Sequence, residues 1–213
     1  GAVLLVALRG FEPPSLQKLG ALAYSFPVEL GVSAARVAAV LLLSAALCLG
    51  VTYLAHTKPA AGGFIALGGE LLASIPAVVW WPLLSRVALS YAWGPQVVML
   101  VVFLQGAFWY LYFNLIVYGL SSVRRDLMEM TSVYRVRGVA YFRYFFVPSL
   151  LPSLATGALS AWGGAWNASI VAEYVSLGGT TLDLGGVGAM ISKFAEKGDS
   201  PALLLTALLL SLF

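Results

Sequence analysis

Long apolar runs separated by short polar segments dominate the hydropathy pattern of this 213-residue chain. Runs of about 20 apolar residues can cross the roughly 30 Å hydrocarbon core of a bilayer as helices. The pattern predicts spans at about residues 31–55, 60–89, 96–119 and 149–176, and a partial span at 201–213. The apolar runs are continuous rather than alternating, which favours helices over the strands of a membrane barrel. The sequence therefore predicts an all-α, polytopic membrane helix bundle of about five to six spans.

The two ends of the chain follow a different pattern from the middle. Gly1–Leu8 is apolar but too short to cross a bilayer, so it is expected to be the end of a helix that begins earlier. Residues 10–30 are polar enough for a surface or interfacial connection, with Pro27 among its breakers. The stretch from Pro201 onward would extend only about 20 Å as a helix. We therefore expect a single transmembrane domain over residues 1–213, cut at both ends.

Several polar residues lie within or beside the predicted spans. Ser33 is expected to cap the first span, and Arg36 lies near its start, where its side chain can extend to the interface. Pro76 is expected to kink the second span, because proline removes one backbone hydrogen bond and clashes with the preceding turn. Glu70 in that span is a candidate partner for a basic residue of the central loop. Arg86 is predicted to anchor the span at the far interface.

Composition supports a multi-pass protein of the cell membrane. The chain is 61% hydrophobic and 10% charged, with a mean hydropathy of +0.92, whereas soluble domains have about 25% charged residues. The chain has one cysteine, Cys48, so an intrachain disulfide is excluded. It also has one histidine, His56, and a metal site is not expected from one cysteine and one histidine. The chain contains no phosphate-binding loop of the Gly-x-x-x-x-Gly-Lys-Ser/Thr type, so no nucleotide chemistry is expected on it. The pI near 9.1 gives little support to nucleic-acid binding, because the excess charge lies in one loop.

That loop is Ser121–Pro148, the charged loop. It carries two acidic residues, Asp126 and Glu129, and five arginines, for a net charge of 5 − 2 = +3: Arg124, Arg125, Arg135, Arg137 and Arg143. Each charge at a bilayer centre costs roughly 2.5–3.5 kcal/mol, so the loop cannot span the membrane. Its basic bias predicts a cytoplasmic location, and the weakly acidic Leu177–Ser200 falls on the opposite side.

Apolar residues recur at helical spacing in the charged loop, which indicates two short helices joined near Gly138. An amphipathic helix lying on the membrane surface is one interpretation. The spacing of nineteen residues from Glu129 to Pro148 indicates another, because it resembles the cytoplasmic EAA loop of the membrane subunits of binding-protein-dependent ABC importers. Met130 and Thr131 stand where that family has two alanines. Arg135 stands where it has glycine, and Gly138 follows three residues later. The residues that the resemblance assigns to ATPase coupling are Glu129, Arg135, Arg137, Gly138, Phe142 and Pro148.

Other segments extend the resemblance over nearly the whole chain. Ser74-Ile75-Pro76 looks like the family's pattern before the loop. The run of residues 163–175 is similar to permeases of nitrate, sulfonate and taurine importers, and residues 186–191 fit the extracytoplasmic segment of the same group. The resemblance implies a type I ABC importer permease fold.

The resemblance also implies partners. Two permease copies, as a homodimer or a fused repeat, would surround a central path within membrane lipid. The charged loop would dock as a coupling helix on a cytoplasmic ATPase dimer that carries the ATP and magnesium, so this chain would be a transport subunit without a cofactor of its own. An extracytoplasmic solute-binding protein would deliver the substrate.

Five residues are candidates for the translocation path: Pro76, Trp162, Trp166, Asn167 and Glu173. An acid such as Glu173 within a span is a functional candidate, as a path-lining or gating group. Structural polar packing is the alternative for Glu173, and interhelical hydrogen bonding is the alternative for Asn167.

Two further classes of protein compete with the permease. An ion-coupled secondary transporter or channel would need a coupling-ion site, for which only Glu70 and Glu173 are available within the spans. A membrane scaffold or intramembrane enzyme is the third alternative. A Ser-His-Asp set is implausible, because His56 falls on the opposite side of the membrane from Asp183 and Asp199. We therefore expect a permease that moves a small solute, with an anion such as nitrate, a sulfonate or taurine as the candidate class.

Overall fold

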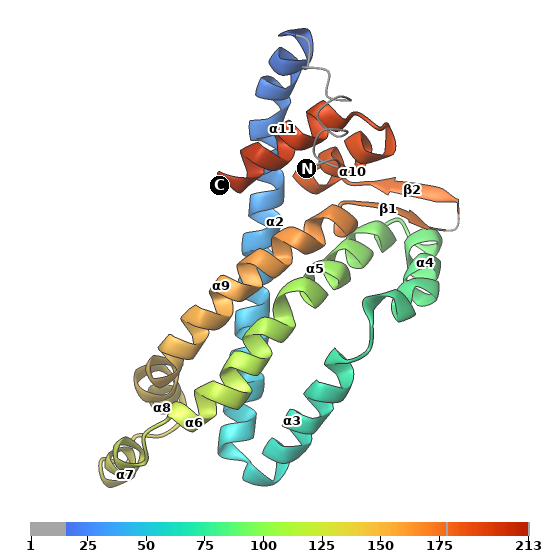
Figure 1. Ribbon diagram of the computed structural model, residues 1–213. Helices are drawn as coiled ribbons and strands as arrows, with labels where there is room; N and C mark the ends of the chain where they lie inside the picture. The colour runs from blue at the N-terminus through green and yellow to red at the C-terminus, as the bar shows by residue number, and fades with distance from the viewer. Residues whose placement is uncertain (1–15, 178, 213) are drawn as a thin grey trace, which may run out of the picture. The chain divides into compact units, whose positions relative to one another are not determined.

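The computed structural model describes residues 16–177 and 179–212 (Figure 1). The chain divides into two compact units. Unit 1 contains the described parts of Gly1–Arg36 and Ser169–Phe213, and unit 2 is Val37–Ala168. The expectation for Gly1–Leu8 lies outside the described residues.

The first long helix, α2, begins much earlier than the hydropathy pattern predicts. It covers Leu16–Thr57, so the prediction of a surface connection is wrong for its described part. Pro27 lies inside this helix. A proline removes only one backbone donor, and Phe26 before it and Ser33 after it are both buried, so packing holds the helix together across it. Ser33 is also inside α2, and the prediction that it caps a helix is wrong.

The range 60–89, predicted as one kinked span, is divided into shorter elements in unit 2. Helix α3 covers Pro59–Ala73, a 3₁₀ turn η1 covers Ala77–Trp80, and helix α4 covers Trp81–Ser90. The expected effect of Pro76 is confirmed and is stronger than a kink, because the helix stops before it.

Two π-helical segments of unit 2 are associated with the charged loop: one precedes it, and the other lies within its C-terminal end. Helix α5 (Gly94–Phe113) continues into the π segment η2, and a second π segment, η3, leads into helix α9 (Val147–Ala172). Figure 1 shows α7 at the tip of the charged loop, beyond α6 and α8. The elements from η2 to η3 are η2 (Asn114–Gly119), α6 (Leu120–Ser122), α7 (Arg125–Val133), α8 (Gly138–Tyr141) and η3 (Phe142–Phe146).

Glycines let α5 and α9 touch through their backbones. A Cβ on Gly106 would lie 2.7 Å from the carbonyl oxygen of Gly164, and a Cβ on Gly164 would lie 2.1 Å from that of Gly106. Both distances are too short for any side chain. This close approach is typical of small residues at membrane helix interfaces.

Unit 1 contains a β-hairpin that the hydropathy pattern does not predict. Helix α9 ends at Ala172, and strand β1 (Tyr174–Leu177) pairs antiparallel with β2 (Thr180–Asp183). The predicted span at 149–176 is therefore too long at its C-terminal end. The sequence of residues 187–195 allows a short helix or a re-entrant turn, and the structure has a helix there, α10 (Val187–Glu196).

Helix α11 (Ser200–Ser211) follows, with Pro201 in its first turn, and Asp199 caps it by accepting from the Ala202 N–H. Three described helical stretches are long and apolar enough to cross a membrane: Gly20–Thr57, Gly94–Ser122 and Gly138–Ala172. The all-α membrane fold class is thus confirmed, with the hairpin as a small addition to it.

Candidate functional site

A buried carboxylate organises the polar residues of unit 1. Glu173 is 0% exposed and lies between α9 and β1. The Ser33 hydroxyl lies 2.8 Å from both of its carboxylate oxygens. Arg36 donates to Oε1 at 2.9 Å, and the Gly188 N–H donates to Oε2 at 2.9 Å. A buried charge is tolerated only when it is paired and hydrogen-bonded, and Glu173 meets both conditions.

Arg36 connects this carboxylate to the segment before α10. Besides the ion pair with Glu173, it donates to the carbonyl oxygens of Leu184 and Gly185, each at 2.7 Å. Ser33 in turn accepts from the Val187 N–H at 2.8 Å. The prediction that Arg36 extends to the interface is therefore wrong, because three acceptors within unit 1 hold its guanidinium.

Two glycines make room for this arrangement. Gly186 has φ 110°, and a Cβ there would lie 2.3 Å from the Glu173 carboxylate. A Cβ on Gly188 would lie 2.3 Å from the carbonyl oxygen of Ser169. Glu29 accepts a hydrogen bond from the Gly186 N–H. We call Glu29, Ser33, Arg36, Glu173 and the segment 184–188 the polar cluster.

The α2 members of the polar cluster share one helical face, and this is a signal that sequence reasoning missed. Glu29, Ser33 and Arg36 are spaced i, i+4 and i+7, which places them on the same side of a helix. The spacing carries meaning only if residues 16–30 are helical, and Pro27 argued against that. The face could have been found by testing the helical period across the proline.

The charged loop of unit 2 exposes its charged residues to solvent, whereas Glu173 in unit 1 is buried. Glu129, Arg135, Arg137 and Gly138 are all exposed. Helix α7 also exposes apolar side chains at helical spacing, with exposed fractions of 36% for Leu127, 52% for Met130, 77% for Val133 and 74% for Tyr134.

Arg135 keeps the backbone shape of the glycine that it replaces in the EAA pattern. Its φ is 54°, in the left-handed region that favours glycine. The Val136 N–H donates to Thr131 O at 2.9 Å and the Arg135 N–H donates to Ser132 O at 3.2 Å. These two bonds form a Schellman motif that ends α7. Gly138 also has a positive φ, of 61°, so two left-handed residues shape the bend.

One exposed ion pair lies at the start of α7. Arg124 donates two hydrogen bonds to Asp126, and these bonds lower the pKa of the Asp126 carboxyl. In unit 1, burial works to raise the pKa of Asp183. The hydrogen bonds from Lys193 and the Gly185 N–H, together with the charge of Lys193, outweigh burial, so that pKa lies below its ordinary value.

Aromatic residues tie the second half of the charged loop to the end of α2. His56 Nε2 lies 2.8 Å from the Tyr141 hydroxyl, and the His56 ring lies 5.0 Å from that of Phe146. Tyr53 meets Phe142 and Phe146 edge to face, with ring centroids 5.1 and 5.2 Å apart. We call Tyr53, His56, Tyr141, Phe142 and Phe146 the aromatic cluster. Sequence reasoning assigned Phe142 to coupling but gave His56 no role.

The remaining predicted site residues are dispersed. Trp162 and Trp166 pack against each other with ring centroids 6.0 Å apart, and Asn167 beside them is exposed. Pro76 is exposed at the break after α3, and Pro148 is exposed in the first turn of α9. Arg86 is exposed on α4.

Neither an ion pair for Glu70 nor a metal site is seen in the described part of the chain. Glu70 is exposed on α3, and among the described residues it forms no ion pair with the charged loop. Within residues 16–177 and 179–212, no group of three or more His, Cys, Asp and Glu is placed to hold a metal.

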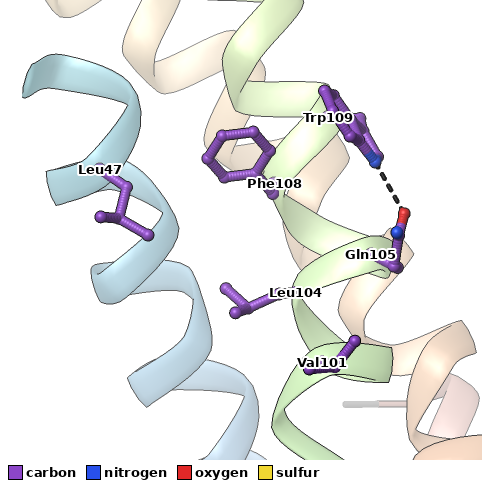
Figure 2. A pocket seen from close by; sticks show the side chains of 6 residues that line it. All are labelled: Leu47, Val101, Leu104, Gln105, Phe108 and Trp109. Atoms are coloured by element: carbon purple, nitrogen blue, oxygen red, sulfur yellow. Dashed lines mark hydrogen bonds between the residues drawn. The ribbon is translucent and has the colours of Figure 1, made fainter. Parts of the chain in front are cut away.

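An apolar cavity of about 230 Å³ lies in unit 2. Figure 2 shows Leu47 of α2 facing Leu104 and Phe108 of α5 across it. Trp109 Nε1 donates to Gln105 Oε1 at 2.7 Å, which joins two of its polar groups. The cavity is lined by no charged residue, so it offers no ion pair to an anion or a coupling ion.

Comparison with known proteins adds two findings. Residues 46–213 match the family described as the inner membrane component of binding-protein-dependent transport systems. Over 59 residues, 28% of the chain, the sequence is 36% identical to a protein named putative aliphatic sulfonates transport permease protein SsuC of Escherichia coli. The aligned segment spans 22% of the length of that relative.

Proposed function

This chain belongs to the family of inner membrane components of binding-protein-dependent transport systems, and from that premise we propose that a separate ATPase drives it through the charged loop. It is a permease component of an ABC transporter and a multi-pass membrane protein. We also propose that the chain forms the path for a small solute of the nitrate, sulfonate or taurine class. The partial similarity to a sulfonate permease favours a sulfonate.

The observation that carries the proposal is the exposed apolar face of α7. Leu127, Met130 and Tyr134 lie at i, i+3 and i+7 of a helix whose surroundings are strongly charged. Within the described chain this face stays exposed, and burying it would be favourable by about 25 cal/mol per Å². A groove on an ATPase would cover it, and a membrane surface is the alternative cover.

The test is assembly of the permease with an ABC ATPase that co-purifies with it. Met130→Glu places a charge in the middle of the apolar face, so it is expected to weaken co-purification with the ATPase at least tenfold. Ser132→Glu adds the same charge on the opposite side of α7, and it is expected to leave assembly unchanged. If both variants assemble normally with the ATPase, the apolar face of α7 is not the ATPase contact, and a membrane-surface helix is favoured instead.

Transport itself separates the permease from its competitor. Uptake into liposomes that contain the permease, the ATPase and the binding protein is expected to require ATP. Uptake driven by an ion gradient without the ATPase would overturn the proposal in favour of a secondary transporter. The partners expected beside the chain remain the ATPase dimer, a solute-binding protein and a second permease copy.

A further inference from the structure

Unit 1 contains a second cavity, separate from the residues predicted to line a path. It has a volume of about 160 Å³ and is lined by Glu29, Gly186, Met190, Lys193, Phe194 and Lys197. Its four residues from 190 to 197 are spaced i, i+3, i+4 and i+7, so one face of α10 forms most of the wall. Glu29 of α2 and Gly186 form the rest.

Two opposite charges line this cavity without neutralising each other. Lys193 is already paired, since its Nζ lies 2.6 Å from Asp183 Oδ2. Lys197 and Glu29 form no ion pair with each other or with any other residue of the described chain. The Glu29 carboxylate accepts one hydrogen bond, from the Gly186 N–H, and an ionised carboxylate can accept several more.

We propose that this cavity binds a small zwitterion, with its ammonium group on Glu29 and its acidic group on Lys197. Met190 and Phe194 supply the apolar wall for the short carbon chain between the two charges. A simple anion would satisfy Lys197 alone and would lie beside an uncompensated Glu29. The volume suits a solute much smaller than the drug-sized ligands of typical pockets, which occupy about 300–1,000 Å³. As a substrate site, the cavity rests on the proposed function and narrows the solute to one that carries both charges.

The direct test is binding to the purified chain in lipid nanodiscs, measured by titration calorimetry. The probes are 3-aminopropanesulfonate, propanesulfonate, which lacks the amine, and propylamine, which lacks the acid. The zwitterion is expected to bind saturably and at least about tenfold more tightly than either single-charge probe, since each loses one charged hydrogen bond. 4-Aminobutyrate tests whether a carboxylate serves as well as a sulfonate, and saturable binding of either zwitterion supports the site.

Matched variants test which residue binds each charged group of the zwitterion. Lys197→Gln is expected to weaken binding of the zwitterion about tenfold and to leave propylamine unaffected. Glu29→Gln retains an acceptor for the Gly186 N–H, and it is expected to weaken the zwitterion but not propanesulfonate. Lys58→Gln, an exposed lysine at the start of α3 in unit 2, is the charge control and is expected to change nothing.

Three results would overturn the zwitterion site: equal affinity for propanesulfonate and the zwitterion, no effect of either cavity variant, or no saturable binding of any probe. ATP-dependent uptake distinguishes this failure from that of the proposed function. Uptake of propanesulfonate as fast as that of the zwitterion refutes the site and supports the permease. Saturable zwitterion binding with ATP-independent uptake supports the site and refutes the ATPase coupling.

Discussion

Two glutamates show how differently the two units treat charge. Glu173 in the polar cluster is fully buried and accepts from Ser33, Arg36 and a backbone amide. Glu129 in the charged loop is exposed on a nine-residue helix. The Arg36–Glu173 pair of the polar cluster is satisfied internally, whereas the charged loop leaves both charges and apolar side chains uncovered. A region whose buried charges are paired internally stabilises the fold, whereas a region with an exposed apolar face needs a partner to bury that face.

The largest expected effect comes from breaking the polar cluster. Arg36→Met leaves Glu173 buried without its cation, which is expected to cost about 3–5 kcal/mol of unfolding free energy. The matched control is Arg143→Met in the charged loop, where the guanidinium is exposed and lies over the Tyr144 ring at 5.7 Å. That change is expected to cost no more than about 1 kcal/mol.

Thermal unfolding in detergent, with hydrogen exchange at the Leu184 amide, measures the difference between these variants. Should Arg36→Met fail to fold, Glu173→Gln provides a milder test, because it removes the charge but keeps one carbonyl acceptor for Ser33 and Gly188. Equal stability of the Arg36 and Arg143 variants would show that the two regions do not differ as described.

An intermediate effect is expected at the aromatic cluster, which ties the charged loop to α2. Tyr141→Phe removes the hydroxyl that meets His56 but keeps the ring, so the loss is expected to be about 1 kcal/mol. Hydrogen exchange over residues 138–146 should rise, and each ATP hydrolysed should move less solute. Tyr144→Phe is the control, because that ring is 73% exposed. Identical exchange in both variants would mean that the His56 contact does not hold the loop.

The smallest effect is expected at the end of α7, where the substitution should stabilise the loop rather than destabilise it. Arg135→Gly relieves the left-handed backbone and is expected to stabilise the loop by about 0.5–1 kcal/mol. Arg135→Ala removes the same charge but keeps the strained φ, so it should not stabilise. Limited proteolysis of the loop distinguishes the two. If alanine stabilises as much as glycine, the gain comes from the lost charge rather than from the backbone.

The sequence was informative for features that depend on residues close together in the chain. Pro76 marked a helix break, and α10 forms where the sequence allows a short helix or a re-entrant turn; the exclusion of Ser121–Pro148 from the bilayer stays a prediction. The EAA spacing pointed to the family that residues 46–213 match, and Arg135, at the glycine position of that pattern, has a left-handed φ. Whether the loop residues couple to an ATPase, and whether Asn167 or Trp162 lines a path, stay predictions.

The rest depended on contacts between distant parts of the chain. Arg36 and Glu173 are 137 positions apart, so no local pattern joins them, and each was interpreted alone as an interfacial or path residue. The helix before Ser33 was missed because Pro27 was interpreted as a helix breaker, although residues on both sides of it are buried in the structure. The hairpin at Tyr174–Asp183 was missed because an apolar run of this length does not separate the end of a helix from a strand.

The contact between Gly106 and Gly164 determines where a solute cannot go. With each carbonyl oxygen occupying the space of the other residue's missing side chain, the two backbones are in direct contact, and neither a water molecule nor an ion fits between them. At this contact, α5 and α9 therefore leave no room for a solute between them. Any route past unit 2 has to run along a surface that α5 and α9 present to something else, such as a second copy of the chain, rather than between these two helices.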